Sequence, residues 1–233
     1  GDWGDAGPKT IMEDEKKFHD LVCEKYPGLP YFMFGHSMGS MIARDYSATY
    51  GEDLTGAVYC GTLGIFQNTH SVKEKLNKII EAGGAHDADP NLVAELMGWM
   101  FAYCEEGATL GNEWICHDPY VQKDHAEDPF DAFTHPVHNV SLRDFIDMML
   151  NIEGTTWAEK VPEDLPVLLI AGDEDPVGSW GEGVYVCANW LRETGHDVIV
   201  NLYPGYRHEI HNYDDLKEEV ENCVIDFLDM VNE

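Results

Sequence analysis

Ser37 stands in a short segment whose residue types suit nucleophilic chemistry. It is the central residue of Gly35-His36-Ser37-Met38-Gly39, which follows an apolar run and precedes the helix-forming residues 41–44. A serine on a tight turn from a strand to a helix needs neighbours without side chains, because the backbone there is strained and crowded. Such a turn lifts the hydroxyl out of the sheet. The segment therefore predicts a nucleophilic serine.

A serine hydroxyl attacks efficiently only when a base removes its proton and a carboxylate orients that base. In the chain order Ser, Asp, His, the acid follows a later strand and the histidine follows the strand after it. Asp175 comes after the apolar run at 166–172, and His208 comes after the run at 198–203, so both fit. Asp173 and Glu174 are rival carboxylates beside Asp175; if they are not catalytic, we expect them to be solvated loop residues.

The elements that must position these residues alternate in type. Strands are predicted at 30–35, 54–60, 166–172 and 198–203, with helices at about 38–50 and 181–194. A first helix is predicted with these apolar residues on one face: Ile11, Met12, Phe18, Leu21 and Val22. A last helix is predicted to bury one face that consists of Leu216, Val220, Cys223, Val224, Phe227 and Val231. Short apolar runs that alternate with amphipathic helices indicate an α/β fold, a mostly parallel sheet with helices on both faces.

The alternation stops between about residues 65 and 160. That stretch is largely helical, with helices expected at 92–103 and 142–150, and it contains no internal repeat. We therefore expect an α/β core made of residues 1–64 and 161–233, and a helical cap or lid insertion made of residues 65–160.

Three motifs together resemble the monoacylglycerol lipase and lysophospholipase branch of the α/β-hydrolases, which includes serine aminopeptidase-type relatives. They read GHSMGS at 35–40, GDEDPVG at 172–178 and YPGYRHEI at 203–210. Residues 112–114, 117–118 and 128–129 are similar to the lid of bacterial members. The resemblance implies that Ser37 attacks an ester carbonyl to form an acyl-enzyme. It also favours Asp175, directly before Pro-Val-Gly, as the acid that orients His208.

The resemblance also implies an oxyanion hole. One donor is the backbone N–H of Met38, the residue after the nucleophile. The second comes, in the family, from a His-Gly loop upstream of the nucleophile, beside a strand that ends in Gly-His-Gly, and neither segment occurs in these 233 residues. We therefore expect that the N-terminal strands of the fold are missing from this chain. We expect them to be supplied by another segment of the same protein, by a cleaved chain or by a swapped copy.

The expected substrate is a single-chain lipid ester, a monoacylglycerol or a lysophospholipid. The segment 92–103 is apolar around much of a helix, so it either lines an acyl pocket or is plain core, and Trp99, Met100 and Met149 are the candidate substrate contacts. Within enzymes, a serine aminopeptidase or a thioesterase is the alternative. From another class, the alternative is a non-catalytic hydrolase-fold fragment or binding module.

The histidines near these motifs suggest neither a metal nor a second base. His208 and His211 are three residues apart, whereas the histidines of a zinc-protease helix are four apart, so no metal and no cofactor are expected. We expect His211 to cap a turn or face solvent and His36 to point away from the site. In the insertion, the surface or lid-packing residues are His117, His135 and His138.

Composition limits the partners. The 14 Lys and Arg against 44 Asp and Glu give a formal net charge of -30, which repels nucleic acid and anionic membranes and mildly favours neutral glycerides. No run approaches the length of an integral membrane segment. The six scattered cysteines form no CxxC pair, which favours a reducing compartment, so we predict a cytoplasmic location. If the true N-terminus lies elsewhere, a signal peptide remains compatible with the sequence.

Overall fold

The computed structural model describes residues 3–4, 7–101, 109–130 and 135–233. In chain order, its elements are α1 (Gly7–Lys25), β1 (Phe32–His36), α2 (Met38–Tyr50), the 3-10 turn η1 (Gly51–Asp53), β2 (Gly56–Cys60), α3 (Thr69–Glu81), α4 (Pro90–Phe101), α5 (Pro119–Glu127), α6 (Asn139–Asn151), α7 (Thr155–Ala158), β3 (Val167–Gly172), α8 (Glu182–Glu193), β4 (Val198–Tyr203), the 3-10 turn η2 (Ile210–Asn212) and α9 (Lys217–Asn232).

A parallel sheet forms the centre, with its strands in the order β1-β2-β3-β4. The register pairs Phe34 with Val58, Val58 with Leu168, and Leu168 with Ile199. Every residue of β2 and β3 is buried, as expected for central strands that are covered on both faces. The α/β architecture predicted from the alternation of apolar runs and helices is confirmed.

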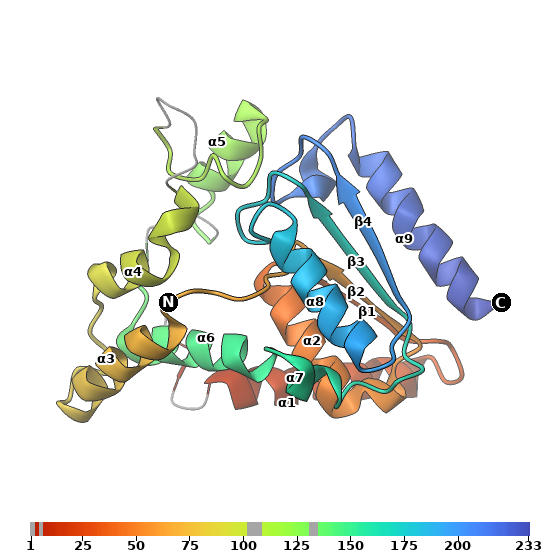
Figure 1. The fold of residues 1–233 in the computed structure, drawn as a ribbon, viewed down its shortest axis with the longest axis horizontal. Helices are drawn as coiled ribbons and strands as arrows, with labels where there is room; N and C mark the ends of the chain where they lie inside the picture. Colours follow the sequence, from red (N-terminus) through yellow and green to blue (C-terminus); the bar gives the residue numbers. More distant parts are fainter. Residues whose placement is uncertain (1–2, 5–6, 102–108, 131–134) are drawn as a thin grey trace.

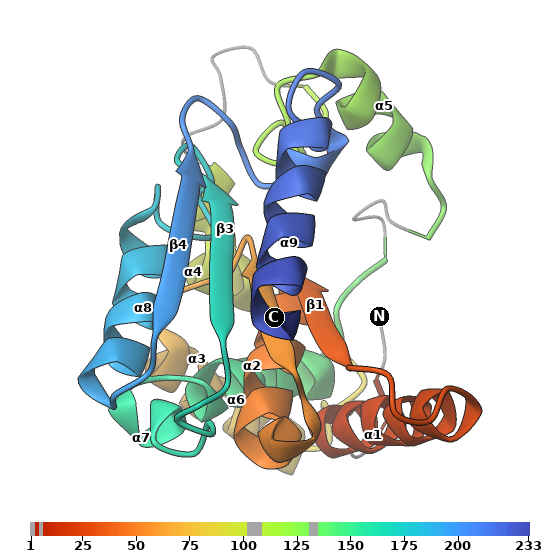
Figure 2. The same cartoon turned by 90° about the vertical axis from the view of Figure 1, so that its right-hand side faces the viewer.

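Helices cover both faces of this sheet (Figures 1 and 2). α2 and α8 lie on one face, whereas α9 runs along the other. α9 turns Val220 and Phe227 inward, and both are buried. The carboxyl ends of all four strands point to the same edge of the sheet, so the loops that follow β1, β3 and β4 meet there.

α1 contacts the core only in part as predicted. Ile11 and Met12 are partly buried against the core, but Phe18 and Leu21, from the same predicted face, are 60% and 62% exposed. The buried contact is His19, which stacks on Tyr31 at a centroid distance of 4.0 Å and hydrogen-bonds the hydroxyl of Tyr46 at 2.5 Å. α1 therefore joins α2 through a polar aromatic contact.

The stretch between β2 and β3 is helical, as predicted. α4 and α6 match the expected helices, although residues 102 and 103 lie outside the described part of the chain. α6 packs against α1, α2 and α3, so one end of this insertion is built into the core. Its division from the core at residues 65 and 160 stays a prediction.

β1 is an edge strand of the described sheet, and its Phe34 is 49% exposed. Within the residues that the structure describes, each helix is too short or too polar to cross a bilayer.

Candidate active site

The predicted nucleophile lies at a strained turn between β1 and α2. Ser37 has φ 56° and ψ -122°, which is rare for a residue with a side chain. Its N–H donates to the carbonyl of Cys60 at 3.0 Å, and its own carbonyl accepts from the N–H of Ser40 at 2.8 Å. Backbone strain of this kind persists only where the surroundings enforce it, and it is typical of functional sites.

The two glycines of the motif have different reasons to be there. A Cβ on Gly35 would lie 2.2 Å from the carbonyl oxygen of Gly39 and 2.9 Å from Cβ of Ala43, so only glycine lets α2 leave this close to β1. A Cβ on Gly39 would meet nothing within 4 Å. The expected crowding on both sides of the serine is therefore correct for Gly35 and wrong for Gly39.

Asp175 and His208 meet directly at the carboxyl edge of the sheet. His208 Nδ1 lies 2.9 Å from Asp175 Oδ2, and the side chains are 2% and 0% exposed. The other oxygen, Asp175 Oδ1, accepts from the N–H of Val177 at 2.8 Å, which fixes the carboxylate. Because a carboxylate only accepts, the imidazole donates from Nδ1 and leaves the lone pair on Nε2. Nε2 is buried and has no hydrogen-bond partner among the described residues.

Gly61 connects this pair to the nucleophile turn. It has φ +57°, and a Cβ there would lie 3.1 Å from Cε1 of His208 and 3.3 Å from Cδ2 of His36. Because Ser37 N–H is bound to the neighbouring Cys60, residues 60 and 61 contact both the nucleophile turn and the base. The structure thus brings Asp175 and His208 into contact and places Ser37 at the end of β1, which pairs with β2, the strand that precedes Gly61.

Met38 begins α2. The first N–H groups of a helix have no partner within the helix, and the helix dipole favours negative charge at this end. The N–H of Met38 therefore suits the role of an oxyanion donor, which stays a prediction.

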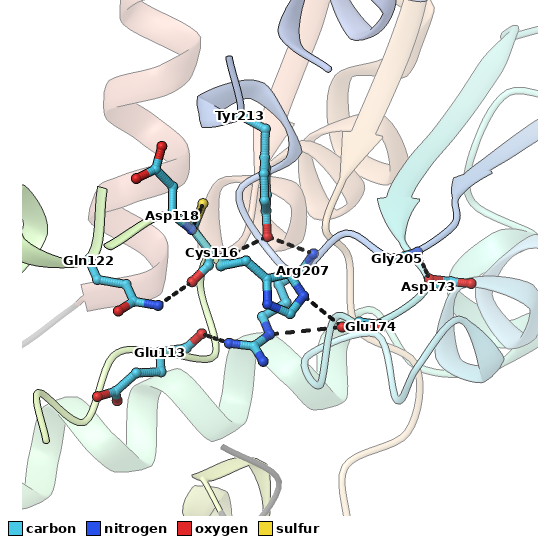
Figure 3. A network of polar contacts seen from close by, with 10 residues as sticks. Glu113, Cys116, Asp118, Gln122, Asp173, Glu174, Gly205, Arg207 and Tyr213 are labelled. Atoms are coloured by element: carbon cyan, nitrogen blue, oxygen red, sulfur yellow. Dashed lines mark hydrogen bonds and ion pairs between the residues drawn. The ribbon is translucent and has the colours of Figure 1, made fainter. Parts of the chain in front are cut away.

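A polar network joins the insertion to the loops that carry Asp175 and His208 (Figure 3). The guanidinium of Arg207 donates to the carbonyl of Glu113 at 2.5 Å, and its Nε lies 4.0 Å from Glu174. The hydroxyl of Tyr213 accepts from the N–H groups of His117 and Arg207, at 2.9 and 3.2 Å. The contacts of Glu113 with Arg207 and of His117 with Tyr213 were not predicted, because they join residues 94 and 96 positions apart.

Asp173 and Glu174 lie in the loop after β3 and are partly exposed and exposed, respectively, in keeping with the expected solvated loop residues, but each also has a bonding partner. Asp173 Oδ1 accepts from the N–H of Gly205 at 2.6 Å, and Glu174 Oε2 lies 2.8 Å from His117 Nε2. Asp173 and Glu174 thus bind the loop after β3 to neighbouring segments. Of the three carboxylates in this loop, Asp175 is the one that hydrogen-bonds His208. His117 packs as a lid residue, in line with its expected role.

Trp114 of the insertion lies against His208, the predicted base. Its ring centroid is 5.1 Å from that of His208, and the backbone N–H of Glu209 donates to the carbonyl of Ile115 at 2.8 Å. Only 8% of Trp114 is exposed. The insertion therefore shields one side of the imidazole from water.

The expectation that His36 points away from the site is wrong, and His211, expected to cap a turn or face solvent, is partly buried against His36. His36 Nε2 lies 3.1 Å from the carbonyl oxygen of His208, and its ring is 4.6 Å from the rings of both His208 and His211. His36 ends β1 beside the backbone of His208, and η2 places the ring of His211 against that of His36.

These histidines also raise the question of a metal. Ligand atoms of His36, Cys60 and His211 lie within 4.8 Å of one another, the one such group found among the described residues. Burial lowers the pKa of His36 to about 3 and also lowers that of His211, so both rings are neutral. Burial raises the pKa of the Cys60 thiol, which opposes the thiolate that a metal requires.

The predicted substrate contacts lie in two settings. Trp99 is partly buried, and its ring is 5.9 Å from that of Trp180, which follows the acid loop. Met100 and Met149 are 4% and 2% exposed, within the main apolar cluster. Their packing suits core residues, and contact with a substrate stays a prediction for all three.

The model of a hydrolase family described as serine aminopeptidase, S33, matches residues 6–215. The chain belongs to this family. This hydrolase is 24% identical over 229 residues to the monoacylglycerol lipase of Mycolicibacterium smegmatis, covering 94% of this chain and 70% of the relative.

Solved structures agree. A highly thermostable carboxyl esterase from Bacillus coagulans, in complex with glycerol, superimposes with a TM-score of 0.95 at 51% identity, covering 99% of this chain and 74% of the other. A lipase in its open form gives a TM-score of 0.89 at 31% identity, with 98% and 74% covered. The hydrolase therefore has the α/β-hydrolase fold, and it is a carboxylic-ester hydrolase.

Proposed function

We propose that the chain hydrolyses esters of single-chain lipids, monoacylglycerols or lysophospholipids, through an acyl-enzyme formed on Ser37. The observation that carries this proposal is the buried hydrogen bond between His208 and Asp175, which leaves Nε2 of His208 free at the sheet edge where Ser37 sits on its strained turn.

His208 takes the proton of Ser37 through Nε2, and the oxygen of Ser37 attacks the ester carbonyl. Asp175 holds the tautomer and stabilises the imidazolium that results. The N–H of Met38 donates to the oxyanion, an interaction that contributes about 3 kcal/mol by mutational precedent. His208 then gives its proton to the leaving alcohol, and water releases the fatty acid by the same route.

The lipid class is proposed from the relatives and from the charge. One relative is a monoacylglycerol lipase, and the carboxyl esterase of Bacillus coagulans was solved with glycerol. A net charge of -30 disfavours anionic lipids and therefore favours neutral monoacylglycerols. We place the acyl chain along Trp99, Met100 and Met149.

A fluorophosphonate probe tests the chemistry. We expect one adduct on the wild type, none on Ser37→Ala, and about 10⁴-fold slower labelling of Asp175→Asn, which would favour the wrong tautomer. Ser47→Ala is the matched control, because Ser47 is a buried serine of α2 whose hydroxyl bonds the carbonyl of Ala43 away from the site. Labelling of Ser37→Ala at the wild-type rate would overturn the assignment of the nucleophile.

Substrate assays test the class. We expect monoacylglycerol to be turned over faster than a lysophospholipid, and both much faster than an aminoacyl anilide. Preference for the anilide would replace the lipase proposal with the aminopeptidase reading, and preference for a thioester would replace it with the thioesterase reading.

We further propose that another strand covers the free edge of β1 in the working enzyme. Unpaired edge strands with apolar side chains tend to pair with other chains, and Phe34 on β1 and Leu29 before it are 49% and 66% exposed. Native mass spectrometry should show a species heavier than 26.2 kDa. A stable, soluble and active species of that mass would contradict this.

A further inference from the structure

His36 connects the nucleophile strand to the backbone of the base. It is the last residue of β1, directly before Ser37, and its Nε2 lies 3.1 Å from the carbonyl oxygen of His208. A carbonyl oxygen only accepts, so His36 donates from Nε2. Two residues that are 172 positions apart are thereby joined through one hydrogen bond.

The ring of His36 is held on several sides. It lies at 4.6 Å from the ring of His208 and, edge to face, at 4.6 Å from that of His211. Gly61 leaves just enough room for it, because a Cβ there would lie 3.3 Å from Cδ2 of His36. The donor therefore has little freedom to swing away from the base loop.

We propose that His36 is a positioning residue: through the carbonyl of His208 it holds the main chain of the base, and so sets where Nε2 of His208 lies relative to Ser37. This inference rests on the proposed function. Asp175 orients the imidazole ring, whereas His36 anchors the backbone that carries the ring. The base is thus fixed from two sides, and one of the two anchors belongs to the strand that carries the nucleophile.

The protonation state of His36 suits this role. Burial, with the nearby imidazoles of His208 and His211, lowers the pKa of His36 to about 3. The ring stays neutral while the enzyme works, and it adds no positive charge that would weaken the basicity of His208.

His36→Phe and His36→Gln separate positioning from packing. Phe keeps a ring but removes the donor, and Gln keeps an N–H donor of similar reach. His196→Phe is the matched control, since His196 is a buried histidine, 5% exposed, whose Nε2 lies 3.0 Å from the carbonyl of Val161, away from the site.

Small displacements of catalytic groups cost on the order of 100-fold in rate, so we expect His36→Phe to lower kcat about 10- to 100-fold, with KM within about twofold. His36→Gln should recover most of this loss, and His196→Phe should keep the wild-type kcat. The far-downfield proton signal of the His208–Asp175 hydrogen bond should shift or broaden in His36→Phe alone.

Two failures are distinguishable. If wild type itself is not labelled by the fluorophosphonate, the proposed function fails. If wild type is labelled but His36→Phe matches it in kcat and in the downfield signal, or if His196→Phe loses as much kcat, the positioning role is overturned and the proposed function stands.

Discussion

Two buried arginines join the insertion to the core, and they differ in the kind of partner they hold. Arg44 on α2 is 0% exposed and donates to the hydroxyl of Thr62 at 3.2 Å and to the carbonyls of Leu63 and Ile152 at 2.6 and 2.5 Å. We call these four residues the hinge junction, because Leu63 follows β2 and Ile152 follows α6. They lie where the chain leaves β2 and where α6 ends.

The edge junction consists of Arg207, Glu113, Glu174 and His117, beside the base. Here Arg207 is 7% exposed, but the side chain of Glu174 is 47% exposed and bonds a partly exposed His117. Arg44, in contrast, bonds neutral oxygens and lies with its guanidinium carbon 4.5 Å from the ring centre of Trp157. The insertion is therefore fixed by a dry contact where it is rooted and by a charged, partly wet contact where it covers the site.

The comparison predicts that the hinge junction matters most for stability. Arg44→Met leaves the buried carbonyls of Leu63 and Ile152 without donors, so we expect a loss of about 3 kcal/mol in the free energy of unfolding, measured with urea.

The control is Arg192→Met, because Arg192 donates to the carbonyl of Val198 at 3.0 Å from an exposed position, so its loss should cost under about 1 kcal/mol. If both variants lose the same free energy of unfolding, the buried hydrogen bonds of Arg44 contribute no more to stability than the exposed one of Arg192.

Acid should destabilise the protein through His36 and spare the hinge junction. The folded pKa of His36, about 3, lies below its unfolded value, so the stability from its neutral ring is present above about pH 6.5 and is lost as pH falls toward 3. The loss is at most about 1.4 kcal/mol for each pH unit.

Urea titrations between about pH 6.5 and about pH 5 test this. The dependence of stability on pH should be shallower in His36→Phe than in wild type, and unchanged in Arg44→Met, whose guanidinium does not titrate in this range. Equal slopes for His36→Phe and wild type would mean that His36 is protonated in the fold.

Local signals explain why the sequence could predict Ser37, Asp175 and His208 as candidates. Ser37 is marked by its own turn, Asp175 by the strand just before it and His208 by the strand before its loop, so each was visible within about ten residues. The same local reasoning predicted α2 and β4 with their observed ends, residues 38–50 and 198–203.

Contacts between distant segments were out of reach of such signals. The inward side of α1 is decided by His19, which finds Tyr31 and Tyr46, and not by the apolar spacing of Phe18 and Leu21. The role of His36 depends on where the loop after β4 crosses the end of β1. A histidine beside the nucleophile was visible in the sequence, but the direction of its ring was not.

The smallest expected effect concerns Glu174 in the edge junction. Partly exposed ion pairs contribute about 0–1 kcal/mol, so Glu174→Gln should cost under about 1 kcal/mol in stability. Glu95→Gln is the control, because Glu95 pairs with Lys75 at 2.7 Å between α4 and α3, without touching the base loop. Both variants should unfold nearly alike.

Glu174 holds Arg207 and His117 beside His208, so Glu174→Gln, and not Glu95→Gln, should lower kcat/KM, by about two- to fivefold. High salt screens this ion pair, so it should lower the kcat/KM of the wild type toward the value of Glu174→Gln. An unchanged kcat/KM in Glu174→Gln would show that the edge junction holds the insertion without influencing the base.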